Sequence, residues 1–325
     1  MRIVIVTDAN NATAAALVRE SVRICNARPD VELAGFVTSR PQAFHSSHAR
    51  DVVRRVRRLA VAIANPGART GVFGRTRFDL FRLAHAQGVP VLSPAAGGLN
   101  DPEFVAELRE RTRADVALSY YCRTIWKTEL LRAFAQAVNY HDGLLPEYKG
   151  VAATSFSIYN GEATSGFTFH HMTEGIDAGP ILVQGSVTVD ERSTLADVDR
   201  RKAHVAVAAL PDVFDLVAAS SPGRAQDRPG SYCSGKDLTA LSLVARPDLL
   251  SADELLRRIR AFGRIGLEFD GAVWPVTRMR SGRPGRPDRG FTVATADGRS
   301  LRADRIRGLP VRFARRTVAG RGPVR

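Results

Sequence analysis

Short apolar runs alternate with helical patterns through the first two hundred residues of this 325-residue chain. The pattern predicts strands at 3–7, 31–37, 89–92, 115–119 and 137–140, and helices at 12–25, 78–86, 102–112 and 127–134. Strands separated by helices usually pair in parallel, because the helical connection returns the chain to the same end of the sheet. The sequence therefore predicts an α/β fold, in which a Rossmann-like, mostly parallel sheet has helices on both faces.

The character of the chain changes after residue 222. Before that point we expect a helix at 154–160, strands at 166–172 and 181–189, and one long helical stretch at 195–218. Residues 220–231 have the Ser, Pro and Gly content of a linker. A helix at 251–262 with Ser251 as N-cap follows, and then short strands separated by turn residues. We therefore predict a larger domain at 1–222 and a small β-rich, OB-like domain at 223–325.

The net charge of +14 does not by itself indicate a nucleic-acid partner. Only four of the 47 basic residues are lysine, and this arginine excess is typical of the coding bias of a GC-rich genome. Most of the excess charge lies from Gln226 to Arg325, where 21 basic residues accompany 10 acidic ones. A solvated basic surface and an anionic partner both stay open on charge alone.

The chain has no apolar segment of the length that crosses a membrane or opens a signal peptide. Its three cysteines, Cys25, Cys122 and Cys233, are widely spaced and show no metal-binding pattern. We therefore expect a cytoplasmic protein without a membrane partner and without a bound metal. A homodimer stays open.

The stretch VNYHDGLLPEYKG, residues 138–150, indicates a polar site at the end of a strand. Alternate side chains of a strand point the same way, so Asn139 and His141 share one face. Glycine and proline follow at once and end the strand. Ligand sites of α/β sheets lie at such strand ends. A hydrogen-bonded turn with a solvent-facing histidine is the structural alternative.

A second stretch, TEGIDAGPIL at 173–182, places Asp177 between Gly175 and Gly179. The aspartate could be an ordinary turn residue, but together with Asn139 and His141 it suggests a catalytic site. A carboxylate beside an imidazole favours the imidazolium and fixes its orientation. An amide can donate a hydrogen bond to a developing oxyanion. These three functions suit acyl transfer without a covalent enzyme intermediate, and no GxSxG nucleophile motif competes.

The residues from Asp115 to Gln184 resemble the folate-dependent formyltransferases. The resemblance is carried by N-x-H-x-x-L-L-P-x-[YW]-[RK]-G at 139–150 and by Asp in G-[IL]-D-x-G, 38 residues after the Asn. It also includes YYCRTIW at 120–126. Similarity to such enzymes implies N-formyl transfer from 10-formyltetrahydrofolate, with Asn139, His141 and Asp177 as the catalytic residues. It further implies a pterin site formed by two segments: Cys122, Arg123, Thr124 and Ile125 in one, and Thr173, Glu174, Gly175 and Ile176 in the other.

The predicted acceptor site rests on four residues. The loop 7–17 has no glycine run for a phosphate, but Asn10 and Asn11 are candidates for substrate contact; their structural alternative is to cap the first helix. Gly143 stands where many members of the family have serine, so a hydroxyl that often orders the loop is missing. Adjacent strand residues face opposite sides, and by its position in the family His170, rather than His171, is expected to face the pocket; a structural role for both histidines stays open.

The acceptor implied by the resemblance is an amine. The arginine- and lysine-bearing recognition loop of methionyl-tRNA formyltransferases is unrecognisable here, and an insertion at about 42–76 replaces it. We therefore favour a small molecule, such as an amino sugar, hydroxyornithine or a carrier-bound amino acid, in specialised biosynthesis. A tRNA acceptor is the first alternative. A formyltetrahydrofolate hydrolase is the second, although such hydrolases usually carry an N-terminal regulatory domain. A nucleic-acid-binding module would rest on the basic tail alone.

Overall fold

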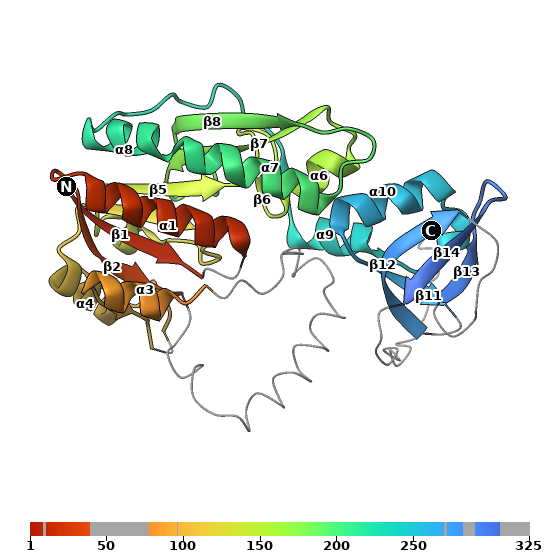
Figure 1. Ribbon diagram of the computed structural model, residues 1–325, viewed down its shortest axis with the longest axis horizontal. Helices are drawn as coiled ribbons and strands as arrows, with labels where there is room; N and C mark the ends of the chain where they lie inside the picture. The colour runs from red at the N-terminus through yellow and green to blue at the C-terminus, as the bar shows by residue number, and fades with distance from the viewer. Residues whose placement is uncertain (9–10, 40–77, 96, 270–271, 282–289, 306–325) are drawn as a thin grey trace, which may run out of the picture.

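The computed structural model describes residues 1–8, 11–39, 78–95, 97–269, 272–281 and 290–305. Figure 1 shows a larger α/β unit followed in the chain by a smaller β-rich unit, which confirms the two kinds of structure expected from the sequence. The insertion predicted at about 42–76 lies outside the described residues.

A seven-stranded sheet forms the centre of the larger unit, in the order β3-β2-β1-β4-β5-β7-β8. Its strands are β1 (Arg2–Thr7), β2 (Glu32–Val37), β3 (Val91–Leu92), β4 (Val116–Tyr120), β5 (Gln136–His141), β7 (Thr164–His171) and β8 (Ile181–Thr188). The first five in this order pair in parallel, and β7 and β8 are antiparallel. The carboxyl ends of the parallel strands therefore lie at one edge, as the sequence predicts.

Helices cover both faces of this sheet (Figure 1). They are α1 (Ala12–Ala27), α3 (Leu80–Gln87), α4 (Pro102–Thr112), α5 (Thr128–Leu131), α6 (Ala153–Tyr159), α7 (Leu195–Ala208) and α8 (Leu210–Ala218). Ile3 and Ile5 of β1 pack in the core that includes α1 and α8, whereas Val4 and Val6 pack in the core that includes α4 and α5. Because both faces of the strand are buried, it is apolar from Ile3 to Val6.

The long helical stretch expected at 195–218 is two helices, so this prediction is wrong in detail. Ala209 lies between them, and Pro211 falls in the first turn of α8. Proline cannot donate a backbone hydrogen bond and clashes with the preceding turn, so it begins a helix more easily than it continues one. The proline was visible in the sequence and marks the break.

The segment 220–231, expected to be a linker, packs along the larger unit. Arg224 and Ile181 exchange two backbone hydrogen bonds of 2.7 Å. Farther on, β9 (Tyr232–Cys233) pairs in parallel with β6 (Lys149–Gly150). Linker composition therefore did not reveal that the backbone is tied to residues that precede it by about forty to eighty positions. The domain boundary at 222 and 223 stays a prediction.

The smaller unit contains a five-stranded sheet in the order β10-β11-β12-β14-β13. Its elements are α9 (Gly235–Ser242), β10 (Leu243–Val244), η3 (Pro247–Leu249), α10 (Ala252–Phe262), β11 (Ile265–Phe269), β12 (Ala272–Ser281), β13 (Gly290–Ala294) and β14 (Ser300–Arg305). Ser251 caps α10, as predicted, by accepting from the Glu254 N–H. The narrower OB-like description stays a prediction.

Aromatic side chains join α10 to α6. The ring of Phe262 lies 6.2 Å from that of Phe156 and 5.7 Å from that of Tyr159, measured between centroids. Phe262 is only 1% exposed. Through this contact, α10 of the β-rich unit packs its apolar side chains against α6 of the larger unit.

We predict that Phe262→Ala lowers the free energy of unfolding by about 3–5 kcal/mol, since a buried aromatic side chain leaves a cavity. Urea unfolding measured by fluorescence tests this. The matched control is Phe81→Ala on α3, where the side chain is 37% exposed, and its cost should be about 0.5 kcal/mol. Equal costs for the two variants would contradict the packing role of Phe262.

Candidate active site

Asn139 and His141 lie on β5 with their side chains on the same face of the sheet, as their spacing predicts. Asn139 is opposite His170 in the antiparallel ladder between β5 and β7. The Asn139 amide nitrogen lies 3.3 Å from Nε2 of His170. Both histidines are buried, whereas Asn139 is partly exposed. Strand pairing therefore brings His170 into the site at a fixed place beside the amide.

Asp177 lies in the loop that joins β7 to β8 and has a φ of 49°. This left-handed conformation is uncommon outside glycine but is tolerated by aspartate. Its Oδ2 atom lies 3.3 Å from Nδ1 of His141, and its Oδ1 atom lies 3.4 Å from Nε2 of His170. The backbone N–H of Gly150 donates to Oδ2 at 2.8 Å. One carboxylate therefore lies between two imidazoles.

The Asp177 side chain is only 11% exposed. Burial alone would raise the pKa of its carboxyl group, but His141, the hydrogen bond to His170 and the Gly150 N–H together lower this pKa from 3.8 to about 2. A carboxyl group whose pKa falls on folding stabilises the fold when ionised. This contribution is present above about pH 4 and is lost as the pH falls toward 2. At neutral pH the group is a carboxylate.

The second nitrogen of each ring contacts a backbone carbonyl. Nε2 of His141 lies 2.9 Å from the carbonyl oxygen of Tyr148, and Nδ1 of His170 lies 2.8 Å from that of His171. A carbonyl can only accept, so each of these nitrogens carries a hydrogen. The other nitrogen of each ring, which faces Asp177, carries a hydrogen only when the ring is charged. A proton taken up here is therefore held between Asp177 and one of the two rings.

Gly143 leaves room for the His141 ring. A Cβ atom at this position would lie 2.8 Å from Nε2 of His141 and 2.7 Å from the Cβ of Ala153. Both distances are shorter than real Cβ contacts. In this chain a side chain such as the expected serine would displace the imidazole, which gives a steric reason for the glycine. Whether Gly143 also contacts an acceptor stays a prediction.

The two segments expected to bind the pterin lie beside the site. Cys122–Ile125 follows β4, and Thr173–Ile176 follows β7; the Thr128 hydroxyl donates to the Glu174 carboxylate and so connects the start of α5 to the second segment. Apolar side chains are exposed here: Ile125 is 61% exposed, Ile176 is 41% exposed and Val151, just after β6, is 44% exposed. Such exposure near polar groups is typical of a ligand site.

Sequence reasoning missed two side chains that hold these loops. Asn100 donates to the Ile125 carbonyl at 2.9 Å and accepts from the Lys127 N–H at 2.8 Å. Gln226 donates to the carbonyl oxygens of Asp177 and Gly179, at 2.8 and 2.9 Å. Both residues come from distant parts of the chain, so no local pattern pointed to them.

The structure describes one of the two asparagines that were predicted to contact the substrate. Asn11 caps α1, because its side chain accepts from the Ala14 N–H at 2.7 Å; its contact with a substrate stays a prediction. Asn10 lies outside the described residues. His171 points away from the site and its Nε2 contacts the Ser221 carbonyl at 2.8 Å, so the two adjacent histidines face opposite ways, as expected. In the described part of the chain, no three His, Cys, Asp or Glu residues are grouped to hold a metal ion.

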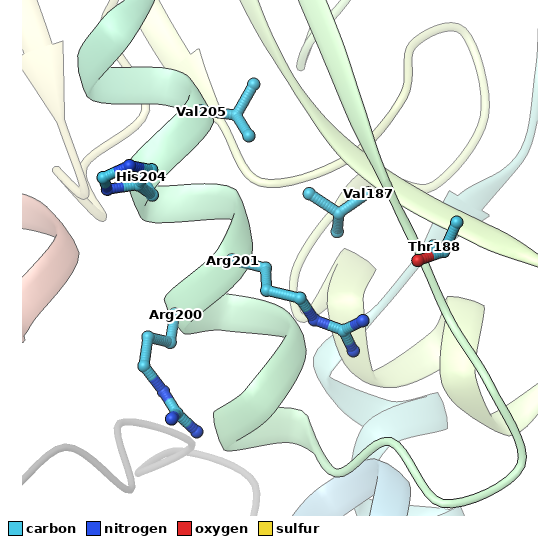
Figure 2. Close-up of a pocket in the computed structure, with 6 residues that line it drawn as sticks. All are labelled: Val187, Thr188, Arg200, Arg201, His204 and Val205. Carbon is cyan, nitrogen blue, oxygen red and sulfur yellow. The ribbon is translucent and has the colours of Figure 1, made fainter.

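A surface hollow of about 480 Å³ lies elsewhere, at the edge strand β8 (Figure 2). Figure 2 shows its lining: Val187 and Thr188 from β8, and Arg200, Arg201, His204 and Val205 from α7. It shares no residue with the site around Asp177.

None of the described helices is long and apolar enough to cross a membrane.

An amide, a carboxylate and two imidazoles thus meet beside the carboxyl end of β5, where α/β sheets usually bind ligands. A family model described as formyl transferase matches residues 30–214, more than half of the chain. The chain therefore belongs to the formyl transferase family, and this membership indicates a formyl-transfer enzyme.

Individual relatives differ in their acceptors. The chain is 29% identical over 199 residues to a methionyl-tRNA formyltransferase of Pelotomaculum thermopropionicum, a match that covers 61% of this chain and 59% of that protein. A sugar N-formyltransferase from Shewanella has a TM-score of 0.60 at 21% identity and covers 88% of this chain and 99% of its own. An N-formyltransferase from Helicobacter canadensis, solved with folinic acid and dTDP-3-aminofucose, has a TM-score of 0.60 at 16% identity, over 94% and 99%. At these identities the structures show a shared fold.

We predict that Gly143→Ala displaces the His141 ring and lowers the free energy of unfolding by about 1–3 kcal/mol, the usual cost of overpacking. Thermal unfolding and a crystal structure of the variant measure both effects. Gly235→Ala is the matched control, because nothing lies within 4 Å of an added Cβ there. A Gly143→Ala variant with wild-type stability and an unmoved ring would contradict the steric explanation.

Proposed function

We propose that this enzyme transfers the formyl group of 10-formyltetrahydrofolate to the amine of a small molecule. The observation that carries the proposal is the contact of Asp177 with both His141 and His170, beside the Asn139 amide. The family membership supports the reaction type. The solved relatives that act on sugars, or are bound to an amino sugar nucleotide, support a small acceptor.

The proposed reaction needs one oxyanion stabiliser and one proton acceptor. The acceptor nitrogen attacks the formyl carbon, and the carbonyl electron pair moves to oxygen, where the Asn139 amide can donate a hydrogen bond. The attacking nitrogen loses a proton to the unit formed by Asp177 and its two histidines. When the C=O bond re-forms, the bond from carbon to N10 of the folate breaks and N10 receives a proton. The products are a formamide and tetrahydrofolate.

The donor site in this proposal uses the two segments on either side of the catalytic residues. Ile125, Val151 and Ile176 offer apolar surface to a flat pterin ring, and backbone groups of 122–125 offer hydrogen bonds. Asn100 and the contact between Thr128 and Glu174 would hold the walls in place. The protein contributes position and electrostatics, since the donor already carries an activated formyl group.

Methionyl-tRNA is the second candidate acceptor. It is favoured by the curated relative that formylates methionyl-tRNA and by the basic C-terminal residues. Against it, the sequence lacks the recognition loop of such enzymes, as argued above.

An acceptor assay with 10-formyltetrahydrofolate labelled in the formyl carbon separates the two candidates. We expect label to appear on at least one member of a panel of amino sugars, nucleotide-linked amino sugars and hydroxyornithine, with little transfer to methionyl-tRNA. Efficient transfer to methionyl-tRNA and none to small amines would overturn the small-molecule proposal. Release of formate alone, whichever acceptor is offered, would indicate a hydrolase.

We predict that Asp177→Asn lowers kcat about 10²–10³-fold, the usual effect of removing one electrostatic stabiliser, while folate binding changes much less. The amide keeps the shape of the side chain but removes the charge that faces both imidazoles. Steady-state kinetics and fluorescence titration with 5-formyltetrahydrofolate measure the two effects. Asp227→Asn, on the exposed part of the 220–231 segment, is the matched control. An Asp177→Asn enzyme within a few-fold of wild type would remove Asp177 from the mechanism.

A further inference from the structure

A buried lysine lies beneath the turn that follows His141. Lys202 is 1% exposed and belongs to the buried side of α7, together with Leu195, Val198 and Ala206. It is one of only four lysines among 47 basic residues. An ammonium group is rarely buried unless it is paired and hydrogen-bonded. The position of Lys202 therefore needs an explanation that packing does not supply.

The Lys202 ammonium donates two hydrogen bonds that converge on the turn. One goes to the backbone carbonyl of Asp142, at 2.6 Å, and the other to the hydroxyl of Thr154 on α6. The same hydroxyl lies 3.5 Å from the Asp142 carboxylate and donates toward it. Asp142 directly follows His141 in the chain. Lys202 is thus tied to the backbone one residue from the imidazole.

Two carboxylates, those of Asp142 and Asp199, interact electrostatically with the buried ammonium. Burial raises the pKa of Tyr121 and Tyr140, and the same two carboxylates raise it further. Burial lowers the pKa of Lys202, and the two carboxylates raise it in part. Burial raises the pKa of Asp199 to about 6, against the effect of Lys202. The ammonium and the two carboxylates therefore influence one another's ionisation.

The rest of the turn is held by neutral donors. The Thr168 hydroxyl donates to the Gly143 carbonyl at 2.7 Å, and the Gln184 amide donates to the Leu145 carbonyl at 2.8 Å. These two residues come from β7 and β8, whereas Lys202 comes from α7. Of these three anchors, Lys202 acts nearest to His141. Charge-assisted hydrogen bonds are also about twice as strong as neutral ones.

We propose that Lys202 is a positioning residue for His141: its buried ammonium holds the Asp142 carbonyl and so keeps the imidazole in contact with Asp177. Only the expected change in kcat rests on the proposed function; the placement of His141 by Lys202 does not. A shift of about 1 Å in a reacting group can cost about 10²-fold in rate. Lys202 itself reaches neither substrate in this scheme.

The test is Lys202→Met, which removes the ammonium and keeps the length of the side chain. The hydrogen bond to the Tyr148 carbonyl protects the Nε2–H of His141 from exchange with solvent. We expect the resonance of this N–H to shift or disappear in ¹H–¹⁵N NMR spectra of the variant. We also expect kcat to fall about 10²-fold with little change in the KM for the folate. Lys236→Met, an exposed lysine on α9, is the matched control and should change neither.

A second variant tests the proposal in case Lys202→Met fails to fold. Lys202→Met with Asp199→Asn removes the ammonium together with one of its two carboxylates, and removal of both members of a charged pair is often tolerated where removal of one is not. It should keep the fold and still lose the His141 signal and the turnover. An unchanged His141 resonance, or kcat within threefold of wild type, overturns the proposal, as does failure of both variants to fold. The NMR result holds whichever reaction is catalysed, so a wild-type enzyme without formyl transfer would refute the proposed function and leave this test intact.

Discussion

The buried carboxylate of Asp177 is the constraint on which the site depends. An isolated charge in a protein interior is costly, so this carboxylate needs partners that do not move. It finds them in His141 on β5, His170 on β7 and the backbone N–H of Gly150. Gln226 holds the same loop from the 220–231 segment. Three separated parts of the chain therefore meet at one negative charge, and Gln226 fixes the backbone of the loop that carries it.

Much of this arrangement could be predicted from the sequence, because it follows from local patterns. The alternation of apolar runs and helices predicted the parallel sheet, and the two-residue spacing of Asn139 and His141 placed both side chains on one face. The glycines around Asp177 marked its loop as a candidate partner. Adjacent positions in a strand also separated His170 from His171. Each of these inferences needs only the periodicity of a strand or the conformational freedom of glycine.

What could not be predicted depends on contacts between distant residues. Gln226 belonged to the expected linker, and no local pattern singled out Asn100, until the fold placed them beside Asp177 and Ile125. Lys202 is a charged residue on the buried side of α7, and its residue type gave no sign of that burial. Gly143 departed from the family pattern, and only the position of the His141 ring explains why. Pairings across 25 to 60 residues leave no periodic trace in the sequence.

In the proposed reaction, the formyl group of the donor lies beside Asn139 at the carboxyl end of β5. The most direct measurement is a crystal structure of the enzyme with 5-formyltetrahydrofolate, a stable form of the donor. We expect the pterin between the 122–125 and 173–176 segments and the folate's formyl group directed toward the Asn139 amide and Asp177. A folate bound at another surface, for example in the hollow beside Arg200 and Arg201, with the Asp177 site empty, would contradict it.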